Sequence, residues 1–198
     1  MSARATFLRW LASFLGFPLG SLLAVTLAGS ITDPLRGALA GLLAGSVIGL
    51  AQWLALRPAG LSILWVGATA SAVALGSAIA AAITGAGTSG GALVLSGLIT
   101  GALVGAAQAL VVGGGVRVVA VWTALVAVAW GLGWFVTANV IVDADRGYVT
   151  FGASGAVLAT VLTGLFVRRL VVRAASGDGR RSAVAPAPAP AATEDGVV

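Results

Sequence analysis

Residues 41–54 read GLLAGSVIGLAQWL, and residues 97–110 read GLITGALVGAAQAL, at an offset of 56 positions. Half of the fourteen positions are identical, and they include Gln52 and Gln108, the only glutamines in the chain. Neither stretch contains a charged residue, and both consist mainly of apolar and small side chains. Such stretches are typical of transmembrane helices. Their repetition predicts a membrane protein built from related helical units.

The composition of the 198-residue chain also points to a lipid environment. Hydrophobic residues make up 59% of the chain and charged residues 9%, against about 45–50% and about 25% in soluble domains. A soluble fold of this length could not bury so much apolar surface. A soluble enzyme or a nucleic-acid-binding domain is therefore excluded, despite the net charge of +5.

Six apolar stretches are long enough to cross a bilayer, which takes about 20 residues per helix. They lie at about 7–29, 34–56, 61–84, 91–112, 116–141 and 148–171. The prediction is an all-α fold, an integral membrane six-helix bundle over residues 1–173, with a kink at Pro18. The first stretch follows Arg4 and Arg9, as in a signal peptide, but its length favours retention as a span. Residues 174–198 are rich in alanine and proline, and we expect a disordered cytoplasmic tail.

Arginine is distributed unevenly between the two ends expected for the bundle. Nine of the eleven arginines fall on the side of both termini, and only Arg36 and Arg146 fall on the other side. Because cytoplasmic loops are enriched in basic residues, both termini are expected in the cytoplasm. Four tryptophans lie near the arginine-rich ends of their helices and are expected to form an aromatic belt at the inner membrane surface. They are Trp10, Trp53, Trp65 and Trp122.

The repeat extends to the helices that precede the two quoted stretches. Trp10, Trp65 and Trp122 recur at spacings of 55 and 57 residues, each near the start of an apolar stretch. A third copy at 154–166 keeps the small residues but has Phe166 where glutamine is expected. We therefore expect three helix-hairpin repeats around an axis along the membrane normal. Their ranges are about 7–56, 61–112 and 116–171.

Glycines recur at every fourth position in both quoted stretches, which places them on one face of each helix. They are Gly41, Gly45 and Gly49 in the first stretch, and Gly97, Gly101 and Gly105 in the second. Lipid provides no hydrophobic drive for helix association, so small residues that allow close backbone approach supply the packing. These six glycines are expected at helix–helix contacts.

Three amide side chains lie inside the apolar stretches and form a candidate polar intramembrane site: Gln52, Gln108 and Asn139. Both glutamines continue the glycine face, so we expect them to point into the bundle at matching depth. One interpretation is hydrogen bonding between helices, which we favour. The other is a polar constriction or ligand anchor on a pathway through the membrane. Asn139 lies in the outer part of the fifth stretch and has the same two interpretations.

The residue inventory removes most catalytic chemistry. Cysteine and histidine are absent, and all six acidic residues lie outside the apolar stretches. We therefore assign no catalytic residue, metal ligand or cofactor, and an enzyme is not expected. Residues 85–90 match GxGxxG, but they follow a membrane helix rather than a strand, so a turn is expected. Residues 143–147 lack the full carboxylate set of a calcium loop, and a turn is expected there too.

Residues 49–57 read GLAQWLALR and are followed by an apolar stretch with a tryptophan near its start. This run resembles the G-x-x-Q-W-L-x-L-R element of a group of uncharacterised bacterial multi-spanning membrane proteins. The resemblance covers about residues 37–80, with a weaker echo at 97–135, where Ala109 replaces the tryptophan. It implies a glycine-rich helical fold in a bacterial plasma membrane, and it implies no activity.

Two functional hypotheses follow. The first is a non-catalytic membrane protein that acts through helix packing, as an accessory or scaffold component. Its expected partners are the lipid bilayer and either a second copy of the chain or a membrane complex, with no nucleic acid. The alternative is a small channel or transporter for a small solute, with a pathway near Gln52 and Gln108. A cavity that reaches the middle of the membrane would favour the alternative.

Reporter fusions test the orientation. Alkaline phosphatase, which is active only outside the cytoplasm, should be active when fused after Ser89, because this turn lies on the side with few arginines. The same reporter fused after Gly60, on the arginine-rich side, should be inactive. The reverse pattern would contradict the predicted topology.

Overall fold

The computed structural model describes residues 2–140, 154–167 and 169, and every regular element in this part of the chain is helical. The elements are α1 (Ala3–Ala12), a 3-10 turn (Ser13–Leu15), α2 (Gly16–Ala28), α3 (Pro34–Leu56), a 3-10 turn (Arg57–Ala59), α4 (Leu64–Thr84), α5 (Gly90–Val111) and α6 (Val116–Val140). A further helix covers Ser154–Val167. The all-α prediction is confirmed. The turn expected at 143–147 and the tail expected at 174–198 lie outside the described residues.

Among the described residues, five helical segments are long and apolar enough to cross a membrane. They are Arg4–Ala28, Pro34–Ala59, Leu64–Thr84, Gly90–Val111 and Val116–Asn139. Their positions agree with the first five predicted stretches. The sixth predicted stretch, 148–171, is described only as the shorter apolar helix Ser154–Val167, so the described residues show five span candidates rather than six.

Local chemistry explains where several helices begin and bend. The Asp33 carboxylate caps α3 by accepting a hydrogen bond from the backbone N–H of Arg36 at 2.9 Å. This bond is the main reason that the pKa of Asp33 lies below its usual value. Ser89 caps α5 in the same way. Pro18 lies in the first turn of α2, which follows directly on the 3-10 turn Ser13–Leu15 after α1. The kink at Pro18 stays a prediction.

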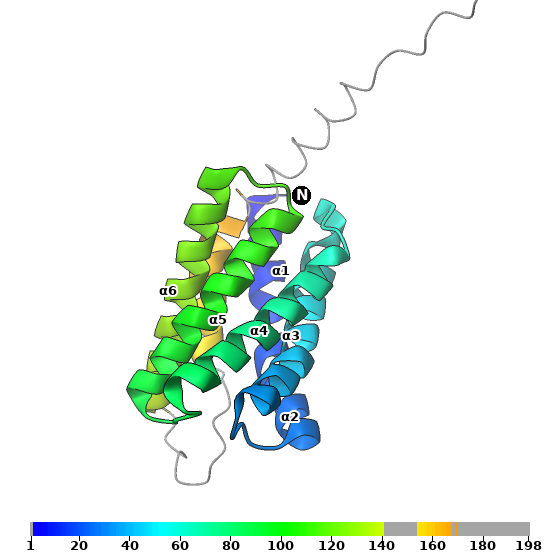
Figure 1. Cartoon of the computed structure of the whole chain (residues 1–198). Coiled ribbons are helices and arrows are strands. Elements are labelled where there is room, and N and C mark those ends of the chain that lie inside the picture. Colours follow the sequence, from blue (N-terminus) through cyan, green and yellow to red (C-terminus); the bar gives the residue numbers. More distant parts are fainter. Residues whose placement is uncertain (1, 141–153, 168, 170–198) are drawn as a thin grey trace, which may run out of the picture.

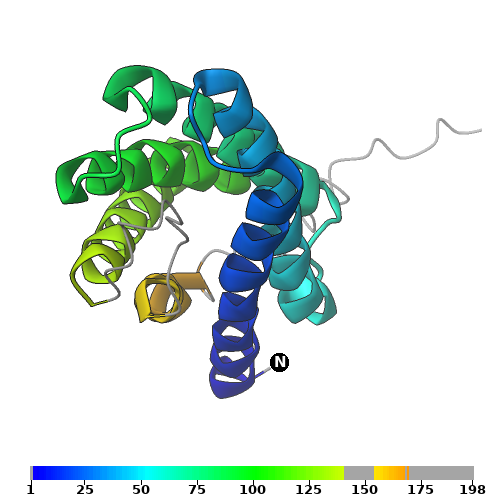
Figure 2. The same ribbon diagram turned by 90° about the horizontal axis from the view of Figure 1, so that it is seen from below.

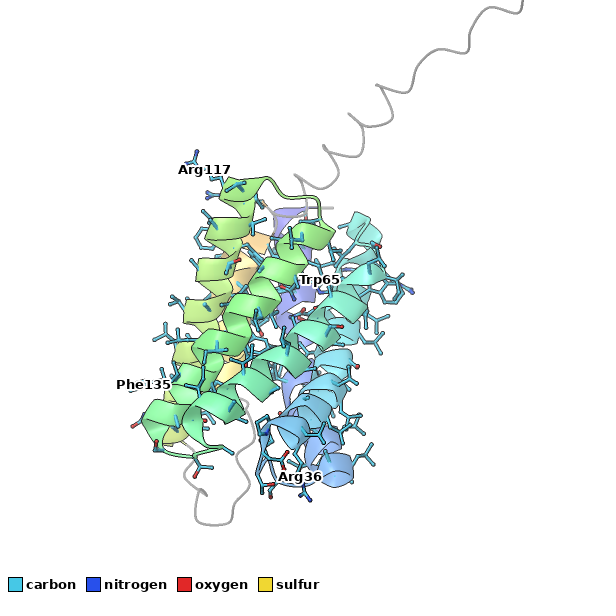
Figure 3. The ribbon with its side chains drawn as sticks, in the orientation of Figure 1. Arg36, Trp65, Arg117 and Phe135 are labelled. Carbon is cyan, nitrogen blue, oxygen red and sulfur yellow. The ribbon has the colours of Figure 1, made fainter. Side chains whose placement is uncertain are left out.

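The helices run alongside one another: α2 continues the direction of α1, and the chain then reverses direction between α2 and α3, α3 and α4, α4 and α5, and α5 and α6 (Figure 1). Seen from below, they form a ring in which α1 lies beside the helix Ser154–Val167 (Figure 2). The helix Ser154–Val167 packs closely against α1 and so closes the ring, since a Cβ atom added at Gly164 would lie 2.9 Å from the Trp10 ring. Arg36 and Arg117 mark opposite ends of the bundle, and we call these the Arg36 end and the Arg117 end (Figure 3).

The predicted glycine faces form the closest helix contacts. A Cβ atom added at Gly41 would lie 2.6 Å from the Val73 carbonyl oxygen, and one at Gly45 would lie 2.9 Å from the Ala70 Cα atom. These contacts join α3 to α4. In α5, Gly97, Gly101 and Gly105 face α6 in the same manner, with Cβ positions 2.8 Å, 2.8 Å and 2.7 Å from Trp130, Val126 and Thr123 backbone atoms, respectively.

The most extensive packing therefore joins α3 to α4 and α5 to α6. In each of these pairs, the two helices come from different predicted hairpins. The contacts within the predicted hairpins use other glycines: a Cβ atom at Gly20 in α2 would lie 2.7 Å from the Ala44 carbonyl oxygen in α3. Gly76 in α4 lies equally close to Thr100 in α5.

The outer surface of the bundle is apolar. Large side chains that are more than half exposed include Leu22, Leu27, Leu35, Ile83, Leu110 and Phe135. Phe135 points away from the bundle in Figure 3. Such a surface suits contact with lipid hydrocarbon rather than water.

Substitution of glycines tests the packing. Gly45→Ala and Gly101→Ala should each lower the free energy of unfolding by about 1–3 kcal/mol, because the added methyl group meets backbone atoms that cannot move aside easily. The measurement is reversible unfolding in detergent micelles. Gly67→Ala is the matched control, since nothing lies within 4 Å of its Cβ position on the exposed face of α4. Equal losses in the control and the test variants would contradict the role of the glycine faces.

Candidate functional site

Gln52 and Gln108 meet inside the bundle. Gln52 comes from α3 and Gln108 from α5, and their exposed fractions are 4% and 1%. The Gln108 Nε2 atom donates a hydrogen bond to the Gln52 Oε1 atom at 3.0 Å. Both side chains thus point inward, as their position on the glycine faces predicts. Close approach of α3 to α4 and of α5 to α6 draws these helices tightly around the pair.

Two tryptophans fix the orientation of the glutamines. Trp65 in α4 donates its indole N–H to Gln52 Oε1 at 3.0 Å, and Trp122 in α6 donates to Gln108 Oε1 at 3.1 Å. An indole N–H can only donate, so each carboxamide must turn its oxygen toward a tryptophan. The second hydrogen bond from Gln108 Nε2 goes to the Thr69 hydroxyl at 3.1 Å. We call these five residues the Gln–Trp network.

A third tryptophan attaches the two ends of the described chain to this centre. The Trp10 indole N–H lies 3.0 Å from the Thr163 hydroxyl oxygen and 3.1 Å from the Thr160 carbonyl oxygen, both acceptors on the last described helix. The Trp10 ring also contacts those of Trp65 and Trp122 edge-on, with centroids 6.4 Å and 6.5 Å away. Three tryptophans thus pack together at the axis of the bundle.

The aromatic belt expected for four tryptophans is wrong for three of them. Trp10, Trp65 and Trp122 are exposed by 2%, 0% and 3%, so they belong to the core rather than to the membrane interface. Trp53 is half-buried, donates to the Leu61 carbonyl oxygen at 3.1 Å and lies under the Arg57 guanidinium, as an interfacial residue can. Position along a helix indicates depth but not which face is buried. In the sequence, the regular spacing of Trp10, Trp65 and Trp122 was the signal that could have indicated their shared place in the core.

Asn139 is not part of this centre. Its side chain is exposed, and its Nδ2 atom donates to the Phe135 carbonyl oxygen of the same helix at 2.7 Å. An amide that bonds to its own helix satisfies its donor locally and needs no partner on another helix. The candidate polar site therefore contains the two glutamines without Asn139.

A cavity of about 380 Å³ lies on the Arg36 side of the network. Helices α2 to α6 contribute to its wall, together with the connections at Ser30 and Thr88. Its hydroxyl groups come from Ser21, Ser30, Ser77, Thr84, Thr88, Ser96 and Thr100, and the rest of the lining is apolar or glycine, with no ionisable side chain among the described residues. The sequence did not indicate this cavity, because it forms between small residues of five different helices.

A much smaller void, of about 10 Å³, lies next to the network. Its polar lining comes from Gln52, Gln108, Thr160 and Thr163, together with the indoles of Trp10 and Trp122. Phe17 and Trp130 line both this void and the larger cavity, and their rings meet edge-on with centroids 5.4 Å apart. These two rings therefore lie at the boundary that the void shares with the larger cavity.

Comparison with protein-family models, curated proteins and solved structures finds no match for this chain. The class of protein therefore follows from the structure itself. In the part of the chain that the structure describes, five long apolar helices with an apolar outer surface define a multi-pass α-helical integral membrane protein in contact with the lipid bilayer. The polar groups at its centre are amides, indoles and hydroxyls, which bind other groups through hydrogen bonds.

Replacing Gln108 tests the network. Gln108→Leu should lower the free energy of unfolding by about 1–3 kcal/mol, because it leaves the buried Trp122 N–H without its acceptor. Unfolding in detergent measures the loss. Asn139→Leu is the control and should change the free energy by less than about 0.5 kcal/mol, since its side chain is exposed. A Gln108→Leu variant as stable as the control would contradict the network's structural role.

Proposed function

We propose that this chain is a non-catalytic membrane protein that binds a small uncharged molecule in the cavity and takes part in its passage across the membrane. The observation that carries the proposal is the cavity itself, whose volume of about 380 Å³ falls within the range of small-molecule sites, roughly 300–1,000 Å³. Of the two hypotheses from the sequence, a cavity of this kind favours the solute pathway. Its position differs from the predicted one, because the glutamines line the adjacent void instead.

The lining suggests the chemistry of the ligand. No ionisable side chain is present among the described lining residues, so a charged ligand would lose its hydration without compensation. The rings of Phe17, Trp130 and Trp134 offer flat apolar contact, and hydroxyls such as that of Thr100 offer hydrogen bonds. A neutral molecule with an apolar body and one or two polar groups suits this surface.

The proposed access is from one side. The connections at Ser30 and Thr88 border the cavity at the Arg36 end, whereas the Gln–Trp network and the tryptophan cluster fill the bundle beyond Phe17 and Trp130. With cytoplasmic termini, as the arginine distribution predicts, the cavity would open to the outside of a bacterial plasma membrane. The network would then act as the inner seal.

We also propose that the bundle consists of three related hairpins. Equivalent contacts support this: Trp65 bonds to Gln52 as Trp122 bonds to Gln108, one repeat later in the chain. The third tryptophan, Trp10, bonds instead to Thr163, which closes the ring. Going around the ring, the tryptophan of each hairpin would thus donate a hydrogen bond to a polar side chain of the neighbouring hairpin.

An accessory or scaffold role is the second candidate function, in which the chain binds a second copy or a membrane complex. The observation that favours it is the enclosure of both glutamines, whose hydrogen bonds hold helices together instead of facing the cavity. In that case the cavity would be a packing gap filled by lipid chains.

Ligand titration distinguishes the two candidates. The fluorescent probe 1-aminoanthracene is neutral, largely apolar and carries one polar group, and it should bind the protein in nanodiscs saturably above the signal of protein-free nanodiscs. Ser96→Phe should weaken binding by at least about tenfold, because the added ring occupies the cavity.

Ser46→Phe is the matched control. Ser46 and Ser96 each donate to the carbonyl oxygen four residues earlier in their own helix, but Ser46 does not line the cavity. The control should bind the probe as the original chain does. Non-saturable binding, or equal loss in both variants, would contradict the ligand site and favour the scaffold role.

A further inference from the structure

The hydroxyl groups in the wall of the cavity differ in their hydrogen bonds. Those of Thr84 and Ser96 each donate to the carbonyl oxygen four residues earlier in their own helix. In the part of the chain that the structure describes, Ser21, Ser77 and Thr100 also line the cavity but make no side-chain hydrogen bond. We call the hydroxyl groups of Ser21, Ser77 and Thr100 the cavity hydroxyls.

The cavity hydroxyls differ from other hydroxyl groups that lack a hydrogen bond. Among the described residues, the buried side-chain atoms without a partner are the hydroxyl oxygens of Thr123, Thr137 and Ser154, which are closed off from any open space. The cavity hydroxyls border an open volume instead, even in the case of Thr100, whose exposed fraction is only 6%. A molecule in the cavity can therefore supply the hydrogen bonds that the protein does not.

Ser77 in α4 and Thr100 in α5 lie at the same depth of the bundle. Gly76 precedes Ser77, and a Cβ atom added at Gly76 would lie 2.7 Å from the Thr100 Cα atom. Gly101 follows Thr100, and a Cβ atom added there would lie 3.0 Å from the Trp130 Cβ atom. The Trp130 side chain, which also lines the cavity, thus adds an aromatic ring next to the two hydroxyl groups.

Ser21 in α2 belongs to the same layer. Its neighbour Gly20 packs against α3, where an added Cβ atom would lie 2.7 Å from the Ala44 carbonyl oxygen. Ala44 lies one turn from Gly41, whose own Cβ position is 2.9 Å from the Ser77 Oγ atom. Three helices therefore each contribute one cavity hydroxyl at about the same level.

We propose that the cavity hydroxyls form a subsite for the hydroxyl group of an apolar alcohol, an assignment that rests on the proposed function of the cavity as a ligand site. A ligand hydroxyl has one donor and two acceptor positions, one for each cavity hydroxyl. The rings of Phe17 and Trp130 contact the apolar body of the alcohol.

The same chemistry disfavours other polar groups. A carbonyl group offers two acceptor positions and no donor, so one cavity hydroxyl would stay without a partner. A charged group would lose its hydration without compensation, because the described lining residues include no ionisable side chain.

Competition between two probes of similar shape tests the subsite. 2-Naphthol is a neutral aromatic alcohol, and naphthalene is the same ring system without the hydroxyl group. Both should displace 1-aminoanthracene from the original chain in nanodiscs, and 2-naphthol should bind at least about fivefold more tightly, at equal concentration in the bilayer. Thr100→Val removes one cavity hydroxyl and keeps the shape of the side chain. It should weaken 2-naphthol binding at least about fivefold and change naphthalene binding less than about twofold.

Thr84→Val is the matched control, because Thr84 lines the same cavity but donates its hydroxyl proton to its own helix. This variant should change 2-naphthol binding less than about twofold, since it removes no cavity hydroxyl. Ser77→Ala is a second test variant, and it should act as Thr100→Val does. Naphthalene binding shows that each variant retains its cavity.

The outcomes separate the subsite from the proposed function. If neither 2-naphthol nor naphthalene displaces the probe from the original chain, the ligand site itself is wrong, and the subsite with it. If both displace the probe equally well, the subsite alone is overturned, even where no variant folds. An equal loss of 2-naphthol binding in Thr84→Val and Thr100→Val also overturns the subsite.

Discussion

The hydrogen bond between an indole N–H and a carboxamide oxygen is the interaction on which the centre of this bundle depends. Within a bilayer, a buried polar group must find its partner inside the protein, because the hydrocarbon supplies none. Gln52 and Gln108 meet this requirement through Trp65, Trp122 and each other. Since an indole N–H only donates, each bond determines the orientation of the whole carboxamide. These hydrogen bonds hold α3, α4, α5 and α6 in register, because the indoles can only donate and the carboxamide oxygens can only accept.

Glycine makes this centre possible. The amides can meet only if the helix backbones approach more closely than ordinary side chains permit, and the contacts at Gly41 and Gly101 leave no room for a Cβ atom. Van der Waals packing along such faces is the main source of helix association in lipid. Packing and polar bonding therefore support each other, because the glycine faces bring together the helices that the hydrogen bonds then align.

The two ends of the bundle differ as a result. Toward the Arg117 end, three tryptophans and two glutamines occupy the axis. Toward the Arg36 end, small residues on five helices leave a cavity of about 380 Å³, with Phe17 and Trp130 as its boundary with the polar centre. The cavity and the polar centre thus lie toward opposite ends of the bundle and differ in chemistry, because small residues line the cavity whereas amides and indoles fill the centre.

The sequence by itself determined the class of protein, the position of five spans, the glycine faces and the inward direction of both glutamines. Hydropathy and i+4 spacing are properties of a single segment, so they can be read without knowing its neighbours. Only the tertiary structure decided which helices those glycines contact, that Trp10, Trp65 and Trp122 lie in the core, that Asn139 bonds to its own helix, and that a cavity exists. A tryptophan suits a membrane interface as well as a buried site with an acceptor, because its ring is apolar and its N–H is polar. The choice depends on whether an acceptor on another helix comes within reach, and that distance exists only once the helices have packed.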